Sequence, residues 1–195
     1  SKGWRVKYYK GLGTSSTKEA KEYFRQLKII SYYKTDEDKT NSQIDKAFNK
    51  KRADDRKVWL KDYNRDKYPN YNDKKMSYGE FIDHELIHFS NEDNDRSLPS
   101  MIDGLKPSQR KVLFACFKRN LKNEIKVAQL SGYVSEHASY HHGEVSLEKT
   151  IKNMAQDYVG ANNINLLEPI GQFGTRLMGG DDSAQSRYIF TKLPT

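Results

Sequence analysis

The second half of the chain contains three apolar patterns with helical spacing, and short glycine-rich segments follow them. Pro107 opens the first pattern, the second is IKVAQLSGYVSEHA (125–138), and the third is GEVSLEKTIKNMAQDYV (143–159). The pieces INLLEPIGQFGTRLMGGDD and SRYIFTKL then predict short extended segments joined by glycine turns. The apolar positions that define the first and third helices are Val112, Leu113, Phe117, Val145, Ile151, Met154, Ala155 and Tyr158.

Three helices followed by a strand hairpin is the order of a winged helix-turn-helix domain, and we expect this fold for residues 98–195. The formal charge of +8 favours an acidic partner, most commonly nucleic acid, although an anionic membrane or an acidic protein is an alternative. A basic patch lies within this domain, made of Lys106, Arg110, Lys111, Lys118, Arg119, Lys122 and Lys126.

The first half has a different character. Its start predicts a strand at Val6–Tyr9, a glycine loop at Lys10–Gly13 and a helix capped near Thr14–Thr17. A strand that runs into a helix is half of an α/β unit, so we expect the chain to begin inside a domain. Residues 31–97 are rich in Lys, Asp, Asn and Tyr and predict a charged connector with loops and some disorder. Short helices are expected there around Ala47, Phe48, Val58, Trp59 and Leu60.

Two general classes of protein are disfavoured. There is no run of eighteen apolar residues and no apolar signal region at the N-terminus, so we expect neither a membrane span nor secretion. The single cysteine, Cys116, excludes an intrachain disulfide framework. Since no acid or base partner stands near it in the sequence, we expect a buried structural thiol rather than a nucleophile.

Three short motifs suggest other chemistry. HELIH (His84 to His88) fits the H-E-x-x-H pattern of zinc proteases, but no third ligand is evident, and an ordinary amphipathic helix is favoured. NEDNDR (91–96) lacks the glycine and the distal glutamate of a calcium loop, so we expect a solvated turn. KGLGTSS (10–16) resembles a phosphate cradle without the G-K-[ST] of a nucleotide P-loop.

Two other motifs bear on phosphate chemistry. His141 and His142 precede a predicted helix N-terminus, where either could donate to a phosphate oxygen or simply cap the helix. Arg187 directly precedes Tyr188. A phenol attacks only with help from positive charge or a base, and Arg187 supplies a permanent cation with a fork suited to phosphate. The alternative is a core tyrosine on a strand, since Ile189 follows.

Several long segments, taken together and in this order, resemble the breakage-reunion core of the eukaryotic-type type IIA DNA topoisomerases. They are VKYYKGLGTSSTKEAKEYF, DNDRSLPSMIDGLKPSQRKVLFACFKRN, KVAQLSGYVSEHASYHHGEVSL, NLLEPIGQFGTRL and DSAQSRYIFTKL. The uninterrupted YHHGE distinguishes the chain from the bacterial gyrase type. The resemblance implies an α+β chain: residues 1–30 are the strand-loop-helix end of a TOPRIM domain, 31–97 a linker, and 98–195 a truncated winged-helix catalytic domain.

The resemblance also implies a site. Tyr188 matches the nucleophile that forms a 5′-phosphotyrosyl link, Arg187 the arginine that stabilises charge on the scissile phosphate, and His142 a histidine that binds the same group. Further DNA-binding residues are expected at Arg96, Lys106, Arg110, Lys111, His141 and Lys10.

Cofactors and partners follow from the same resemblance. It implies Mg²⁺ held by TOPRIM carboxylates outside this chain, ATP bound by a separate domain, double-stranded DNA, a homodimer with catalysis in trans, and a nuclear location. The chain ends seven residues after Tyr188, so we expect a fragment that binds DNA but cleaves it poorly alone. A winged-helix DNA-binding module without chemistry is the main alternative, and a zinc protease is a remote one.

Overall fold

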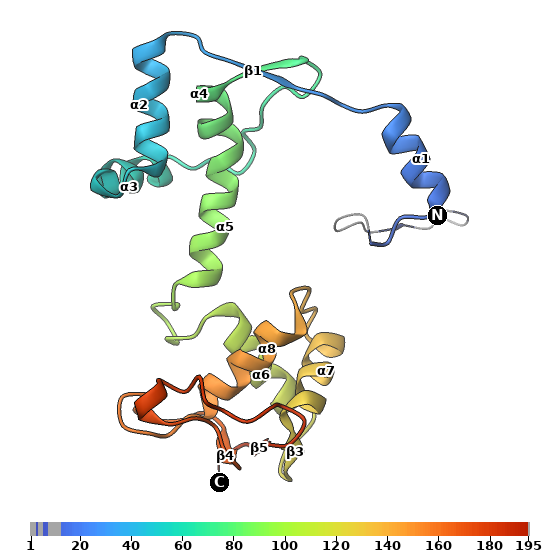
Figure 1. Cartoon of the computed structure of the whole chain (residues 1–195), viewed down its shortest axis with the longest axis vertical. Coiled ribbons are helices and arrows are strands. Elements are labelled where there is room, and N and C mark those ends of the chain that lie inside the picture. Colours follow the sequence, from blue (N-terminus) through green and yellow to red (C-terminus); the bar gives the residue numbers. More distant parts are fainter. Residues whose placement is uncertain (1–2, 4–5, 8–12, 195) are drawn as a thin grey trace. The chain divides into compact units, whose positions relative to one another are not determined.

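The computed structural model describes residues 3, 6–7 and 13–194 and divides into two compact units, Ser1–Asn91 and Glu92–Thr195 (Figure 1). Each unit has a cluster of buried apolar side chains of its own. None of the helices in these ranges is long and apolar enough to cross a membrane.

The first helix of unit 1, α1 (Thr17–Arg25), begins where the sequence predicts. Ser16 caps it and forms a reciprocal capping box with Glu19, which also pairs with Lys7 at 2.9 Å. The strand predicted at Val6–Tyr9 is absent at Val6 and Lys7. A strand there would need a partner, and the described strands of this unit, β1 and β2, pair only with each other. The rest of that prediction, and Lys10 with the start of the glycine loop, lies outside the described residues.

The remainder of unit 1 is a packed helical cluster. It contains β1 (Ser31–Tyr33), α2 (Glu37–Phe48), a 3₁₀ turn (η1, Lys50–Arg52), α3 (Ala53–Lys61), β2 (Lys75–Ser77), α4 (Tyr78–Phe81), a π-helical turn (η2, Ile82–Leu86) and the start of α5 (Ile87–Ser97), whose residues from Glu92 on belong to unit 2. The predicted short helices are therefore present. The parallel pairing of β1 with β2 was not predicted. Trp59, Ile82 and Ile87 form the buried centre, against which Ile44 and Leu60 pack.

Unit 2 contains α6 (Pro107–Lys118), β3 (Ile125–Lys126), α7 (Val127–His137), α8 (Glu144–Ala155), β4 (Glu168–Ile170), a 3₁₀ turn (η3, Arg176–Met178) and β5 (Phe190–Lys192). The strands form an antiparallel sheet in the order β3-β5-β4. The three predicted helices are confirmed, with two boundary errors. Residues 125–126 form a strand because Lys126 pairs with Phe190. The third helix ends at Ala155, before the predicted end, because the Gln156 side chain is buried and its Nε2 donates to the carbonyls of Phe173 and Gly180.

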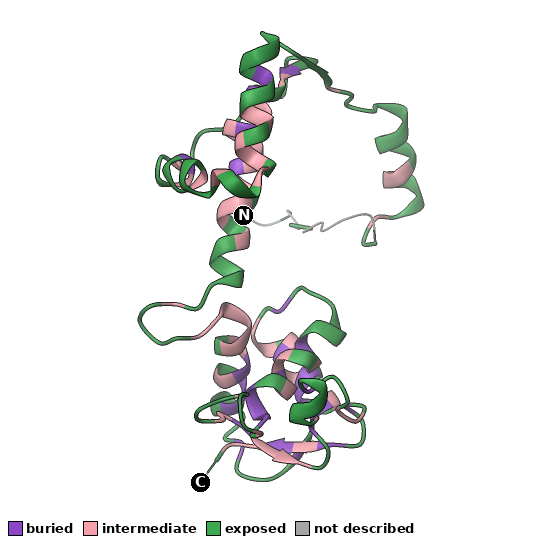
Figure 2. Ribbon diagram, turned by 60° about the vertical axis from the view of Figure 1, so that its left-hand side comes forward, coloured by how far each residue is buried: buried purple, intermediate pink, exposed green. Residues whose placement is uncertain are grey.

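The core of unit 2 lies between the three helices and the sheet (Figure 2). Val112, Ile151, Met154 and Ala155 are buried, as their spacing predicts. Other positions that the sequence analysis placed on the apolar helix faces are not buried. Val145 and Phe117 are 79% and 66% exposed, because the buried face of α8 runs from Leu147 to Ile151, Met154 and Ala155, and that of α6 through Val112, Ala115 and Cys116. Tyr158 lies beyond the helix end and is half-buried.

Cys116 is fully buried on α6, and burial raises the pKa of its thiol to about 11. A thiol with so high a pKa is protonated near neutral pH and is a poor nucleophile. The prediction of a structural thiol is confirmed.

Candidate functional site

A tight turn carries Arg187 and Tyr188. The backbone N–H of Tyr188 donates to the carbonyl of Gln185 at 2.9 Å and closes the turn. On either side of the exposed pair lies a buried residue: Ser186 is 4% exposed and Ile189 is 2% exposed. The turn is thus held at both flanks while its two central side chains face outward.

Two backbone hydrogen bonds attach the start of α7 to this turn. The N–H of Val127 donates to the carbonyl of Ile189 at 3.0 Å, and the N–H of Ala128 donates to the carbonyl of Ser186 at 3.1 Å. These two donors belong to the first turn of α7, where N–H groups have no partner within the helix. The carbonyls of the turn therefore accept hydrogen bonds from N–H groups at the helix end, and these bonds fix the backbone of the turn.

Tyr188 is 65% exposed, so it is not a core side chain. The buried apolar residue of this segment is its neighbour Ile189, and the alternative of a core tyrosine is wrong. The guanidinium carbon of Arg187 lies 4.9 Å from the centre of the Tyr188 ring. This cation–π contact keeps a permanent positive charge beside the phenol.

A hollow of about 300 Å³ lies beside the turn. Ser186 donates a hydrogen bond from its hydroxyl to the Glu148 carboxylate of α8 at 2.8 Å. The hollow is lined by Ala128, Glu148, Lys152, Gln185, Ser186 and Arg187. Glu148 and Ser186 were not predicted from the sequence, because neither stands in a recognisable motif.

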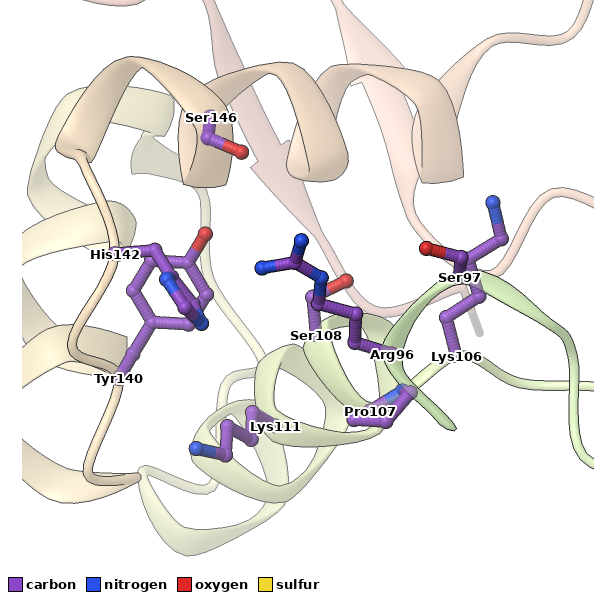
Figure 3. A pocket seen from close by; sticks show the side chains of 9 residues that line it. All are labelled: Arg96, Ser97, Lys106, Pro107, Ser108, Lys111, Tyr140, His142 and Ser146. Atoms are coloured by element: carbon purple, nitrogen blue, oxygen red, sulfur yellow. The ribbon is translucent and has the colours of Figure 1, made fainter. Parts of the chain in front are cut away.

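A second hollow, of about 380 Å³, brings together Arg96, Lys106, Lys111 and His142 of the predicted site (Figure 3). Its other lining residues are Ser97, Pro107, Ser108, Tyr140 and Ser146. Figure 3 shows the Arg96 guanidinium pointing toward Tyr140 and His142. Three cationic side chains and an imidazole around one hollow suit an anion with several oxygen atoms.

Most of these side chains are oriented by neighbours. The His142 ring packs edge-on against Tyr140, with 5.5 Å between ring centres and 78° between planes. Lys111 donates from Nζ to the carbonyl of Ser139 at 2.8 Å. Arg96 donates from Nε and Nη2 to the Asp93 carboxylate at 2.8 and 2.6 Å. The hollow is thus partly preorganised.

The structure does not bring all predicted residues to one place. Arg187 and Tyr188 do not line the larger hollow. Arg110 instead makes a two-pronged bond to Asp103, at 2.7 and 2.8 Å, which holds the pKa of that carboxyl at about 2. His141 is exposed and lines none of the hollows described above.

The HELIH histidines do not form a chelating pair. His88 Nδ1 lies 3.1 Å from the Tyr63 hydroxyl, and its Nε2 lies 2.9 Å from the carbonyl oxygen of Lys67. Within residues 13–194 and the few described before them, no group of three or more His, Cys, Asp or Glu could hold a metal ion. The NEDNDR segment is part of helix α5, so the predicted turn is wrong.

Family models match both halves of the chain. Residues 96–195 match the model that describes the A-type chain of DNA gyrase/topoisomerase IV, and residues 1–94 match the C-terminal associated domain of TOPRIM. The chain belongs to the type IIA DNA topoisomerases.

Within this family the chain is similar to eukaryotic proteins. It is 58% identical to DNA topoisomerase 2-alpha of Rattus norvegicus and 55% identical to DNA topoisomerase 2 of Plasmodium falciparum, over 98% of its length in each case. The crystal structure of the Plasmodium falciparum topoisomerase II DNA-binding, cleavage and re-ligation domain matches 98% of the chain with a TM-score of 0.75 and 55% identity. The predicted resemblance is confirmed. The chain spans 13% and 14% of these two curated relatives and 26% of the solved chain.

Proposed function

We propose that the protein is part of an ATP-dependent type IIA DNA topoisomerase, which cleaves and reseals both strands of one duplex and passes a second duplex through the gap. One observation carries the proposal: an exposed tyrosine stands beside a stacked arginine on a turn anchored at both flanks. A solved relative described as a DNA-binding, cleavage and re-ligation domain supports DNA as the substrate.

The chemistry assigned to Tyr188 is transesterification. The Tyr188 oxygen attacks a backbone phosphorus, the bond from phosphorus to the 3′-oxygen breaks, and a phosphotyrosyl bond to the 5′ end forms. The phenol loses its proton and the departing 3′-oxygen gains one, so the step is balanced. Because one phosphoester replaces another, cleavage consumes no ATP, and the 3′-hydroxyl reseals the strand by the reverse attack.

The cationic side chains supply positioning and charge. We assign Arg187 and His142 to the scissile phosphate, where positive charge opposes the negative charge that develops on the phosphate oxygens. We assign Arg96, Lys106 and Lys111 to backbone phosphates, since they line the same hollow as His142. Arg110, His141 and Lys10 stay predicted DNA contacts. Arg110 would have to exchange Asp103 for a phosphate oxygen.

We further propose that unit 2 is a winged helix-turn-helix domain. The order α6, β3, α7, α8, β4, β5, with an antiparallel sheet ordered β3-β5-β4, supports this assignment. Such a domain contacts DNA through a helix in the major groove and through basic side chains. We keep the division at residues 30 and 97 as a prediction.

Cofactors, partners and location are also proposed. The family suggests Mg²⁺, ATP, a homodimer that acts in trans and a nuclear site. The described residues do not form a metal site of their own, so we assign no catalytic step in this chain to a metal. Mg²⁺ and ATP are expected to bind elsewhere in the whole protein.

Covalent trapping tests the proposal. The full-length protein is incubated with Mg²⁺ and end-labelled duplex, quenched with detergent, and compared with Tyr188→Phe. We expect a protein-DNA adduct with the native protein and none with Tyr188→Phe. Tyr68→Phe is the matched control, because Tyr68 is also exposed. An adduct that survives in Tyr188→Phe would place the chemistry on another residue. DNA binding without any adduct would favour a binding module without catalysis.

A further inference from the structure

A side-chain bond joins α8 to the turn of the nucleophile. The Ser186 hydroxyl donates to a Glu148 carboxylate oxygen at 2.8 Å, and Ser186 is only 4% exposed. Hydrogen bonds to a charged acceptor are stronger than those between neutral groups. Because the hydroxyl is buried, other hydrogen-bond partners have little access to it. The bond therefore attaches the turn to α8, in addition to the backbone bonds that attach it to α7.

The same helix begins next to His142. Helix α8 starts at Glu144, two residues after His142, and Glu148 lies one turn further along. A helix is stiff over this length, because its backbone hydrogen bonds connect successive turns. A continuous path therefore runs from His142 through the first turn of α8 to Glu148, then across the hydrogen bond to Ser186 and on to Tyr188.

Two cations line the same hollow as Glu148: Lys152, which follows it at helical spacing, and Arg187. The carboxylate accepts the hydrogen bond of the Ser186 hydroxyl. We therefore assign the role of Glu148 to this bond.

We propose that Glu148 is a positioning residue for DNA cleavage, which holds the Arg187–Tyr188 turn at a fixed place relative to His142. The inference rests on the proposed function of Tyr188. In-line attack needs the phenol, the phosphorus and the leaving oxygen in one line, and small displacements of a reacting group lower rates strongly. Glu148 is assigned no contact with DNA, and its effect passes through Ser186.

The test measures single-turnover cleavage by the full-length protein at saturating duplex, together with the dissociation constant for the same DNA. We expect Glu148→Ala and Ser186→Ala each to slow cleavage roughly 10-fold with the dissociation constant unchanged. The double variant is expected to be no slower than the slower single variant, since both changes remove one bond. Glu148→Gln retains an acceptor oxygen and should restore most of the rate.

Asp181→Ala is the matched control. It removes the contact at 3.5 Å between Asp181 and Lys149, which also joins α8 to the loop before β5 but lies seven residues from Tyr188. Its cleavage rate should equal that of the native protein. If Glu148→Ala loses its fold by circular dichroism, Glu148→Met, which keeps a similar length without an acceptor, replaces it.

The outcomes separate this inference from the proposed function. If Tyr188→Phe abolishes the adduct but the Glu148 and Ser186 variants cleave at the native rate, the positioning inference alone fails. It also fails if these variants lose DNA affinity and cleavage in parallel, because that result indicates a merely structural bond. An adduct in Tyr188→Phe refutes the assignment of the nucleophile to Tyr188, on which this inference rests.

Discussion

Replacing Ile189 by alanine should loosen the attachment of the Tyr188 turn without touching the phenol. Ile189 is 2% exposed, and its Cγ2 lies 2.9 Å from the place where a Cβ on Gly171 would stand. Such close packing leaves the neighbours little freedom to fill a cavity. Burial of this kind makes Ile→Ala cost about 3 kcal/mol and Ile→Val about 1 kcal/mol.

Hydrogen exchange measured by mass spectrometry on the whole chain can check this. About 3 kcal/mol corresponds to exchange on the order of 100-fold faster at amides that exchange by opening of unit 2. The diagnostic amides are those of Val127 and Ala128, which donate to the Tyr188 turn. Ile189→Val should show a small increase. Ile164→Ala should show none, since Ile164 is 80% exposed.

One result would refute the reasoning. If Ile189→Ala leaves the Val127 and Ala128 amides as protected as in the native chain, the turn is not held by Ile189. Faster exchange confined to unit 1 would equally contradict it, because Ile189 belongs to the core of unit 2.

Three further predictions concern other parts of the molecule. Because burial raises the pKa of Cys116 to about 11, iodoacetamide at pH 8 should label the native chain at least ~100-fold more slowly than the urea-unfolded chain, by mass spectrometry. Arg110 lowers the pKa of Asp103 from 3.8 to about 2, so the stability that this pair contributes should be complete above pH 4 and lost as the pH falls toward 2. An NMR titration of the Asp103 carboxyl carbon checks the midpoint, and Asp103→Asn should remove this part of the pH dependence of stability. His88→Ala should speed amide exchange in the loop that follows α3 by roughly 5-fold or more, since it removes two hydrogen bonds to that region, whereas His84→Ala should not.

The helices of unit 2 were predictable because each contains repeated apolar positions that meet one core. The failures have local causes. The strand β3 has only two residues, and its partner β5 lies more than sixty residues further along, so no local pattern indicates it. Val145 resembles a core position by composition, but α8 buries Leu147 instead, and a shift of two residues on a helix moves a side chain to the other face.

The site was only partly predictable. The residues around Tyr188 left a core tyrosine open as an alternative, and the burial of Ile189 decided between the two interpretations. Arg96, Lys106, Lys111 and His142 lie in separate segments, and only the fold of unit 2 gathers them around one hollow. Glu148 could not be assigned from sequence, because its significance depends on a contact with a residue 38 positions away.

The alternation of buried and exposed residues in the Tyr188 turn has a mechanistic consequence. Ser186 and Ile189 lie inside the fold and are fixed by a hydrogen bond donated to α8 and by two accepted from α7, while Arg187 and Tyr188 between them face outward. Under the proposed function, the turn backbone is therefore ordered before DNA arrives, and binding needs to order little more than two side chains. Removing the buried side chain of Ser186 or Ile189 should then change how often the phenol is aligned for attack, whereas removing the phenol hydroxyl abolishes the proposed phosphotyrosyl bond. The rate of cleavage at saturating DNA distinguishes these two effects.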